Sequence, residues 1–391
     1  MKRKKVIFQM KQNLILDGSK VLYHPDRVQA WLRGERIAPI TIDCALTTHC
    51  SYRCVYCYGK MQLINQAPNL PRQVVMDFLD DAAEIGVKAI SFVSDGESTC
   101  NPCMYEAIQH GKANGLDMAL GTNGFLLKDE ELPNILPCLT YLRFNISAGE
   151  RDRYAYIHGC DPTCYDKVIE TIRKAVAIKR EQKLPVTIGL QMVLMPDFRD
   201  QILPLAQLGR ELGVDYLVIK HCSDDEEGTL GVDYAAYDAL EDILHEAETY
   251  STETYQVSVK WSKIHAHGTK CYKQCYGTPF ILQLSGSGLV APCGMLFNEK
   301  YKRFHIGNIN EQRFKDIWAS DRYWEVMNYI ASPKFDAQTE CGTLCLQHKT
   351  NEVLWHIKHD LNGQMPSGGG TTDQGAARQF HLRLLPELRA G

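Results

Sequence analysis

Residues 40–58 read ITIDCALTTHCSYRCVYCY, an apolar run followed at once by three cysteines. The first part, Ile40–Thr47, has the length and composition of a buried strand. Cys50, Cys54 and Cys57 follow within eight residues. Three thiols so close together cannot all pair in disulfides, but they can bind three corners of an iron–sulfur cube. A structural zinc site needs a fourth Cys or His, so the loop indicates a metal centre with one open, catalytic position.

Short apolar runs alternate with amphipathic segments on both sides of this loop, which predicts βαβ units and a parallel sheet. The predicted strands are Ile40–Thr47, Lys88–Val93, Asp117–Gly121, Tyr141–Ser147, Val186–Met195 and Tyr216–His221. The predicted helices are 72–85, 103–114, 129–136, 165–182 and 200–212. Six such units favour an α/β fold of the partial (β/α)6 TIM-barrel type, in which chemistry gathers in the loops after the strands.

Composition narrows the possible functions. The net charge of −4 argues against broad nucleic-acid binding, which needs a basic surface. The chain contains no apolar run of about 18 residues, and its basic start, Met1–Lys5, leads into no signal peptide. We therefore expect a cytoplasmic protein with no membrane partner. Without an export signal, 15 cysteines indicate metal or redox chemistry before disulfides.

The spacing CxxxCxxC, with the aromatic Tyr56 before the last cysteine, resembles the radical S-adenosylmethionine (SAM) superfamily. The resemblance implies that Cys50, Cys54 and Cys57 hold a [4Fe–4S] cluster whose open iron chelates the amino and carboxylate groups of SAM. It also implies that Tyr56 packs near the adenine. The alternative is a set of core or zinc-binding cysteines.

A second motif, Ser94–Ser98, follows the second strand and reads Ser-Asp-Gly-Glu-Ser. It is similar to the Gly-Gly-Glu motif of the same family, although Ser94 and Asp95 replace its opening. The resemblance implies that Glu97 accepts hydrogen bonds from the SAM ammonium and that Gly96 permits close backbone approach. It assigns Asp95 no role.

Further polar residues follow the third and fourth strands. Asn123 lies in a Thr-Asn-Gly turn that resembles one near the SAM pocket of the family. Asn145 and Ser147 are candidates for SAM ribose or carboxylate contacts, and an ordinary polar strand end is the alternative. Many members of the family carry Ser-x-Asp here, whereas this chain has Gly149 in place of the acid.

Three residues at the end of the sixth strand are candidates for catalysis. Lys220 and His221 are expected to point toward the barrel mouth, where a substrate would bind. Cys222 could donate a hydrogen atom to a substrate radical, because an S–H bond is weak; a buried structural cysteine is the alternative. For Cys100 and Cys103, a CxxC pair beside the second motif, we favour a structural role.

A second group of cysteines lies near the C-terminus. Its spacing is Cys271-x3-Cys275-x12-Gly288-x4-Cys293, then Cys341-x3-Cys345. This pattern resembles the SPASM/twitch extension of many radical SAM proteins and implies one auxiliary [4Fe–4S] cluster. The alignment favours Cys271, Cys275, Cys293 and Cys345 as ligands with Cys341 spare, although the pair 341/345 could be assigned the other way. A structural zinc ribbon is the alternative.

The resemblance implies reductive cleavage of SAM to a 5′-deoxyadenosyl radical, which abstracts hydrogen from the substrate. We expect a carbohydrate-type small molecule that is oxidised or epimerised, because only about 39 residues precede the first strand and leave little room for a leader-binding module. A peptide maturase is the second hypothesis, and a non-catalytic iron–sulfur or zinc protein the third. The expected partner is a reductant protein of the flavodoxin or ferredoxin type.

The expected organisation has five parts. They are an N-terminal extension (1–38), the partial barrel (39–230), a bridging helix and linker (231–263), a small α+β auxiliary-cluster domain (264–362) and a flexible tail (363–391).

Overall fold

The computed structural model describes residues 18–61, 68–343 and 345–360, and these contain one sheet of ten strands in the order β10-β9-β8-β1-β2-β3-β4-β5-β6-β7. The strands are β1 Thr41–Cys44, β2 Ala89–Phe92, β3 Asp117–Thr122, β4 Leu139–Asn145, β5 Thr187–Leu194, β6 Tyr216–His221, β7 Gln256–Val259, β8 Ile281–Leu284, β9 Leu289–Ala291 and β10 Gly307–Asn308. Neighbours from β1 to β7 pair in parallel.

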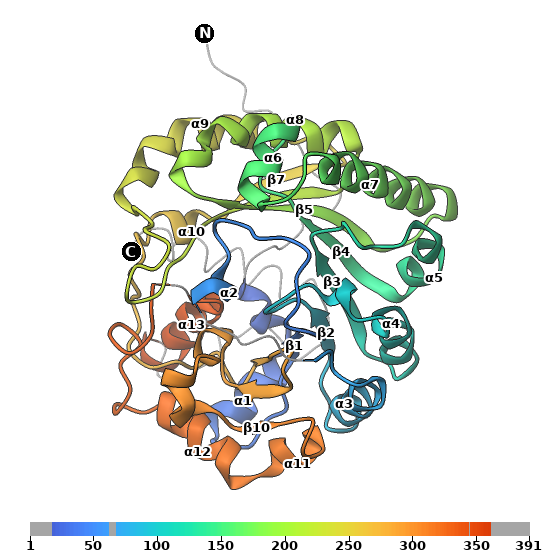
Figure 1. Ribbon diagram of the computed structural model, residues 1–391. Helices are drawn as coiled ribbons and strands as arrows, with labels where there is room; N and C mark the ends of the chain where they lie inside the picture. Colours follow the sequence, from blue (N-terminus) through green and yellow to red (C-terminus); the bar gives the residue numbers. More distant parts are fainter. Residues whose placement is uncertain (1–17, 62–67, 344, 361–391) are drawn as a thin grey trace.

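Helices line the outside of the curved sheet, and the helices near the C-terminus gather beside β1 (Figure 1). The α-helices are α1 Pro25–Leu32, α2 Tyr58–Met61, α3 Arg72–Glu84, α4 Met104–Ala113, α5 Leu132–Ile135, α6 Arg151–His158, α7 Thr163–Gln182, α8 Ile202–Leu212, α9 Glu241–Glu248, α10 Trp261–Ile264, α11 Phe314–Ala319, α12 Asp321–Ile330 and α13 His348–Trp355. None of the helices in the described ranges is both long and apolar enough to cross a membrane.

The hydrophobic pattern explains these layers. β5 is buried at six of its eight positions, as expected of a parallel strand covered on both faces. In α3, buried Val75, Phe78, Leu79 and Ala82 recur at i, i+3, i+4 and i+7, so one face of the helix packs against the sheet. The main core is continuous from β1 through β7 and α3 to α12.

The α/β partial barrel predicted from the sequence is confirmed, and β6 has the predicted bounds. Among the elements that were not predicted are β7 and α6. The strand β7 lies in the segment expected to be a bridging helix and linker. It was missed because Gln256–Val259 is too short for an alternating pattern to stand out. The helix α6 was missed because polar residues dominate Arg151–His158.

The C-terminal hairpin extends the barrel sheet. β8 pairs in parallel with β1, and β9 returns antiparallel to β8 after Gly288, as the sequence suggested for this turn. The segment expected to form a separate small domain therefore shares backbone hydrogen bonds with the first barrel strand.

The start of the described chain packs near its end. Val21, Leu22 and Val28 form a second hydrophobic cluster with Val353 and Leu354 of α13. The predicted flexible tail, 363–391, lies outside the described residues.

Candidate functional site

The first cysteine loop, residues 48–58, is anchored on the end of α6. The backbone N–H of Arg53 donates to the carbonyl of His158 at 3.1 Å, and that of Val55 to the carbonyl of Ile157 at 3.0 Å. The last carbonyls of a helix have no partner within it, so the loop satisfies two that α6 leaves open. Gly159 then adopts a φ of +58°, and a Cβ there would lie 2.5 Å from the Arg53 carbonyl oxygen.

His158 connects this loop to β4 through both ring nitrogens. Its Nε2 accepts a hydrogen bond from the backbone N–H of Ser147 at 3.0 Å, so Nε2 carries no proton. Burial lowers the pKa of His158 to about 3, and the ring is neutral. The proton therefore lies on Nδ1, which is 3.3 Å from the Cys54 sulfur and 3.5 Å from the Tyr56 hydroxyl. His158 donates an N–H···S hydrogen bond to a predicted cluster ligand.

The three thiols of the loop suit an iron–sulfur cluster. Burial raises the pKa of Cys50 to about 12, and the charges of Glu97 and Cys57 act in the same direction. Burial also raises the pKa of Cys54, followed by the charges of Cys57 and Cys50. Such thiols lose their protons when a metal compensates the negative charge. Asn123 Nδ2 approaches the Cys50 sulfur at 4.0 Å and donates to Ser51 at 3.0 Å. The donors around the loop therefore face sulfur atoms that accept.

The Ser94–Ser98 turn packs directly against the strand that leads into the loop. Gly96 has a φ of +107°, and a Cβ there would lie 2.2 Å from the Thr47 carbonyl oxygen. The N–H of Glu97 donates to the carbonyl of His49 at 2.8 Å. Glycine at position 96 is thus required for the close approach that the sequence predicted.

Glu97 is buried and holds the ends of two strands together. Its carboxylate accepts from the Thr122 hydroxyl at 2.7 Å, the Asn123 N–H at 2.7 Å and the Thr99 hydroxyl at 2.8 Å. Burial raises the pKa of Glu97, and these hydrogen bonds oppose that shift. These hydrogen bonds fix the orientation of the carboxylate, and one of them comes from Asn123 in the predicted turn.

Asp95 has a clear contact, although the sequence assigned it none. Its carboxylate accepts from the Ser285 hydroxyl at 2.6 Å and from the Gly286 N–H at 3.1 Å. Burial raises the pKa of Asp95 to about 6. The residue joins the turn after β2 to the β8–β9 hairpin.

Asn145 and Ser147 lie at the end of β4 as predicted. Asn145 accepts from Gln191 Nε2 at 3.1 Å, and the Ser147 hydroxyl accepts from the Val193 N–H at 3.1 Å. The Tyr56 ring lies 5.8 Å from the His158 ring, beside Ser147. Ser147 is therefore linked to the first cysteine loop through His158, whereas the contact given for Asn145 is with β5.

Gly149, which replaces an acid found in many members of the family, is sterically constrained. A Cβ there would lie 2.4 Å from the carbonyl carbon of Pro204 in α8. No aspartate fits at this position unless α8 moves, and the departure from the family pattern has a packing cause.

The three candidates at the end of β6 have different environments. Lys220 faces the barrel interior, whereas His221 bonds to the Cys222 carbonyl at 2.6 Å and packs on the ring of Tyr234 at 5.7 Å. Successive strand residues point to opposite faces, so His221 does not share the orientation of Lys220 that the sequence analysis expected. Cys222 is buried, and burial is the largest cause that raises its pKa to about 12. The charge of Cys57 is a smaller cause that acts in the same direction.

Four C-terminal cysteines form a second group. Burial, followed by the charges of Cys345 and Cys341, raises the pKa of Cys275 to about 12. Burial, followed by Cys345, Cys275 and Cys341, also raises the pKa of Cys293. Cys275, Cys293, Cys341 and Cys345 therefore lie close together, and we call them the second cysteine group.

Cys271 lies apart from this group. It is exposed, and the charges that act on it come from Glu352, Lys349 and Asp360, with no cysteine among them. The sequence favoured Cys271 as a ligand and left Cys341 spare. The structure reverses this preference, and we propose Cys341 as the fourth ligand. The spacing of cysteines alone could not tell these two residues apart.

Two buried side chains donate to the sulfurs of the second cysteine group. Asn351 Nδ2 lies 3.5 Å from the Cys275 sulfur and 3.8 Å from the Cys345 sulfur. Lys270 Nζ lies 3.4 Å from the Cys341 sulfur. Hydrogen-bond donors and a buried cation favour thiolates over thiols, so this group also fits an iron–sulfur cluster.

Tyr58 is affected by one cysteine of each group. Burial raises the pKa of Tyr58 most, and the charges of Asp95, Cys57 and Cys293 act in the same direction. Within the described residues, no three His, Cys, Asp or Glu side chains are gathered to hold a single metal ion. A [4Fe–4S] cluster does not need such a gathering, because each thiolate binds a different iron.

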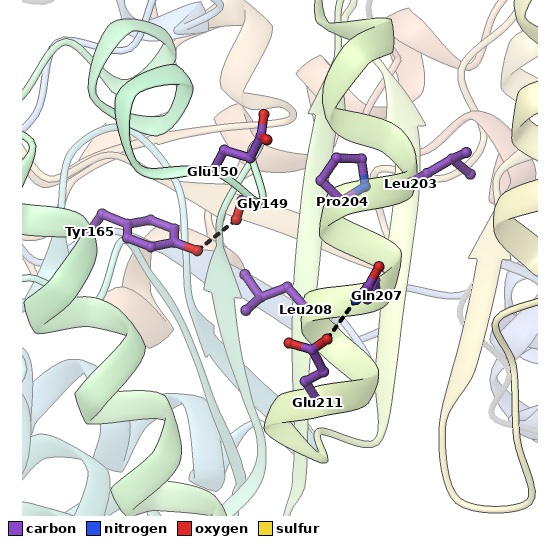
Figure 2. Close-up of a pocket in the computed structure, with 8 residues that line it drawn as sticks. All are labelled: Gly149, Glu150, Tyr165, Leu203, Pro204, Gln207, Leu208 and Glu211. Carbon is purple, nitrogen blue, oxygen red and sulfur yellow. Dashed lines mark hydrogen bonds between the residues drawn. The ribbon is translucent and has the colours of Figure 1, made fainter.

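Figure 2 shows a pocket of about 440 Å³ between α7 and α8, lined by Gly149, Glu150, Tyr165 and residues of α8. The Tyr165 hydroxyl donates to the Gly149 carbonyl at 2.6 Å, and Gln207 donates to Glu211 at 2.7 Å. No cysteine lines this pocket, so we do not place the candidate site there.

The comparisons with known families agree with the two cysteine groups. Residues 45–208 match the model of the radical SAM superfamily, and residues 275–346 match that of SPASM, an iron–sulfur cluster-binding domain. The second match includes the whole second cysteine group and leaves Cys271 out.

Two curated proteins resemble most of the chain. The AdoMet-dependent heme synthase of Methanosarcina barkeri is 26% identical, covering 78% of this chain and 88% of that protein. The tungsten-containing aldehyde ferredoxin oxidoreductase cofactor-modifying protein of Pyrococcus furiosus is 21% identical, covering 76% of this chain and 85% of that protein.

Solved structures share the fold. Streptococcus suis SuiB bound to S-adenosylmethionine has a TM-score of 0.60 at 16% identity, covering 81% of this chain and 75% of SuiB. SuiB bound to its precursor peptide SuiA gives 0.58 at 15%, covering 81% and 73%. The structure of anSMEcpe with bound AdoMet gives 0.55 at 13%, covering 83% and 98%. At these identities the likeness shows the fold alone.

Proposed function

Because residues 45–208 form a radical SAM domain and residues 275–346 a SPASM domain, we propose that the chain cleaves SAM reductively and abstracts hydrogen from a substrate inside the barrel. The radical SAM domain implies a [4Fe–4S] cluster and SAM, and the SPASM domain implies auxiliary iron–sulfur binding. When bound, the first cluster supplies the electron that cleaves SAM. The observation that carries the proposal is the first cysteine loop, in which the Cys50 sulfur lies 4.0 Å from Asn123, the residue whose backbone N–H donates to Glu97.

The residues of this chain have distinct roles in the proposal. Cys50, Cys54 and Cys57 hold the first cluster. Glu97 accepts from the SAM ammonium with an orientation fixed by its hydrogen bonds to Thr122 and the Asn123 backbone. Cys275, Cys293, Cys341 and Cys345 hold the auxiliary cluster.

The polar residues at the strand ends complete the proposed SAM site. Gly96 brings the Glu97 turn against the first cysteine loop, and Asn123 contacts that loop directly. Tyr56 of the loop and Ser147 both contact His158, and Asn145 lies two residues before Ser147. Together they hold SAM and exclude water from the reacting atoms.

The proposed substrate is a small molecule of carbohydrate type, which the reaction oxidises or epimerises. Supporting a small molecule, the two curated relatives that cover most of the chain are named for haem synthesis and cofactor modification. A peptide substrate is the alternative, and its support here is a shared fold with SuiB. The reductant is a flavodoxin- or ferredoxin-type protein, in a cytoplasmic setting.

The test begins with anaerobically purified protein reconstituted with iron and sulfide. Wild type should hold about eight irons, and the Cys50/Cys54/Cys57→Ala variant about four, because each [4Fe–4S] cluster contributes four. With SAM and dithionite, wild type should form 5′-deoxyadenosine and the variant should form none. Zinc in place of iron would refute the proposal, as would fully loaded protein that forms no 5′-deoxyadenosine with any sugar or peptide candidate.

A further inference from the structure

Two glycines on neighbouring strands leave space for the guanidinium of Arg143 in the barrel interior. Arg143 on β4 is in register with Gly121 on β3 and Gly189 on β5. A Cβ on Gly121 would lie 3.1 Å from the Arg143 Nη2, and a Cβ on Gly189 would lie 2.2 Å from the ring of Tyr216. Side chains at these two positions would occupy the space of the guanidinium and the phenol. The two glycines therefore leave room for the side chains of Arg143 and Tyr216 over the neighbouring strands.

The Arg143 guanidinium lacks a hydrogen-bonding partner within the described ranges. Its Nε is buried without an acceptor, and the guanidinium lies 5.7 Å from the centre of the Tyr141 ring. Asp43 of β1 is near enough to feel its charge, but no ion pair within 4.0 Å joins them. Buried guanidinium N–H groups are normally satisfied, so this donor is available to a ligand.

Lys220 on β6 is a second basic side chain on the same interior. Among the described residues it forms no hydrogen bond or ion pair. Burial, then the positive charges of Arg143, Lys263 and Lys260, hold its pKa well below the usual range. Arg143 and Lys220 both act on the Asp43 carboxyl, whose pKa is nevertheless raised to about 6 by burial. A bound anion would oppose these effects and would hold Lys220 in its ammonium form.

Two lysines that act on this interior lie close to cysteines. Lys263 Nζ donates to the carbonyl of Cys345 at 3.0 Å and is affected by the thiols of Cys345 and Cys293. Lys220 is two residues before Cys222, which is itself near Cys57.

We propose that Arg143 and Lys220 form an oxyanion-binding subsite inside the barrel, and that the substrate carries a carboxylate or phosphate group. The guanidinium binds two oxygens through its fork of N–H donors, and the ammonium supplies a point charge. That the bound molecule is the substrate rests on the proposed function. Binding of an oxyanion by Arg143 and Lys220 does not depend on SAM cleavage. It narrows the substrate class to acidic small molecules.

The experiment measures binding of two simple probes to the cluster-loaded protein with SAM present. Radiolabelled inorganic phosphate and radiolabelled succinate are each titrated by equilibrium dialysis, with chloride holding the ionic strength constant. Wild type should bind at least one probe saturably. Arg143→Met and Lys220→Met should each weaken that binding about tenfold or more, while Lys220→Arg retains part of it. Lys112→Met, on the exposed side of α4, is the matched control and should bind as wild type does.

Iron content and SAM binding are measured on every variant, so that misfolding is recognised directly. Binding of phosphate alone identifies a phosphorylated substrate, and binding of succinate alone a carboxylate. Absence of saturable binding of either probe to wild type would overturn the proposal. Loss of SAM binding in the Met variants would also overturn the proposal, because Arg143 and Lys220 would then bind SAM and not the substrate. Failure of the proposed function appears separately, as absence of 5′-deoxyadenosine.

Discussion

His158 shows how one side chain can affect a cluster that it does not bind. Its Nδ1–H points to the Cys54 sulfur, and its Nε2 is occupied by the Ser147 N–H. A hydrogen bond to a thiolate ligand withdraws negative charge and favours the reduced cluster. The imidazole is therefore a positioning residue for the loop and a contributor to the reduction potential.

Replacing His158 by leucine should make the first cluster harder to reduce. The net worth of one hydrogen bond is about 1 kcal/mol, and about 59 mV corresponds to 1.4 kcal/mol for a one-electron couple. The midpoint potential should therefore fall by some tens of millivolts in a titration followed by electron paramagnetic resonance. The auxiliary cluster in the same sample is the control and should not shift. Equal shifts in both clusters, or none in the first, would contradict this assignment.

Gly96 makes a second prediction at the residue scale. Gly96→Ala combines a φ of +107° with a Cβ 2.2 Å from the Thr47 carbonyl oxygen. The backbone must move, and the variant should lose at least about 3 kcal/mol of stability together with iron at the first loop. Gly34 is the matched control, because its φ is +78° and a Cβ there meets nothing within 4 Å. Gly34→Ala should cost about 1 kcal/mol and keep all its iron. Thermal unfolding and iron analysis check both variants, and similar losses would show that strain alone dominates.

At the scale of elements, the second cysteine group depends on α13. Asn351 of that helix contacts two of the four sulfurs and also accepts from the backbone N–H groups of Tyr276 and Gly277, at 2.7 and 2.8 Å. One amide thus fixes both the path of the chain after Cys275 and the position of its sulfur.

The ligand choice in this group can be tested by iron content. Cys341→Ala should reduce about eight irons to about four, or leave a labile auxiliary cluster, because it removes one corner. Cys271→Ala should retain all the iron, since Cys271 lies apart from the group. Each variant controls for the other, and iron analysis after gel filtration in a mild chelator measures the result. The reverse pattern would restore the ligand set that the sequence favoured.

What the sequence could predict follows the range of the interactions. β6 and the loop after β1 could be found because their signals, apolar runs and cysteine spacing, lie within a few residues. The Cys54–His158 contact joins residues 104 apart, and the Asn351–Cys275 contact joins residues 76 apart. The sequence around Cys54 or Cys275 does not indicate these partners, because only the fold brings each pair together. The same holds for Arg143, which reads as an ordinary strand residue until Gly121 and Gly189 are seen beside it.

At the scale of the whole molecule, the barrel and the C-terminal segment act as one body. β8 pairs with β1, Asp95 bonds to Ser285, and the Phe314 ring packs on the Phe78 ring of α3 at 5.1 Å. These contacts set the distance between the two cysteine groups. A substrate between them therefore meets a site whose two sides are fixed relative to each other.

The strongest ionic link between the two parts joins α3 to the start of α11. Arg313 donates two hydrogen bonds to Asp81, at 2.9 and 2.6 Å. The Asp81 side chain is 0% exposed, whereas Arg313 is 43% exposed. Arg313→Met should lower the free energy of unfolding by about 3 kcal/mol, because the buried carboxylate then keeps only the Lys315 backbone N–H at 3.4 Å and the Lys315 ammonium at 3.9 Å. The double variant Asp81→Leu/Arg313→Met removes the charge as well and should recover most of that loss. Urea unfolding measures all three proteins, and a double variant as unstable as the single one would show that packing, not ion pairing, holds the C-terminal segment on the barrel.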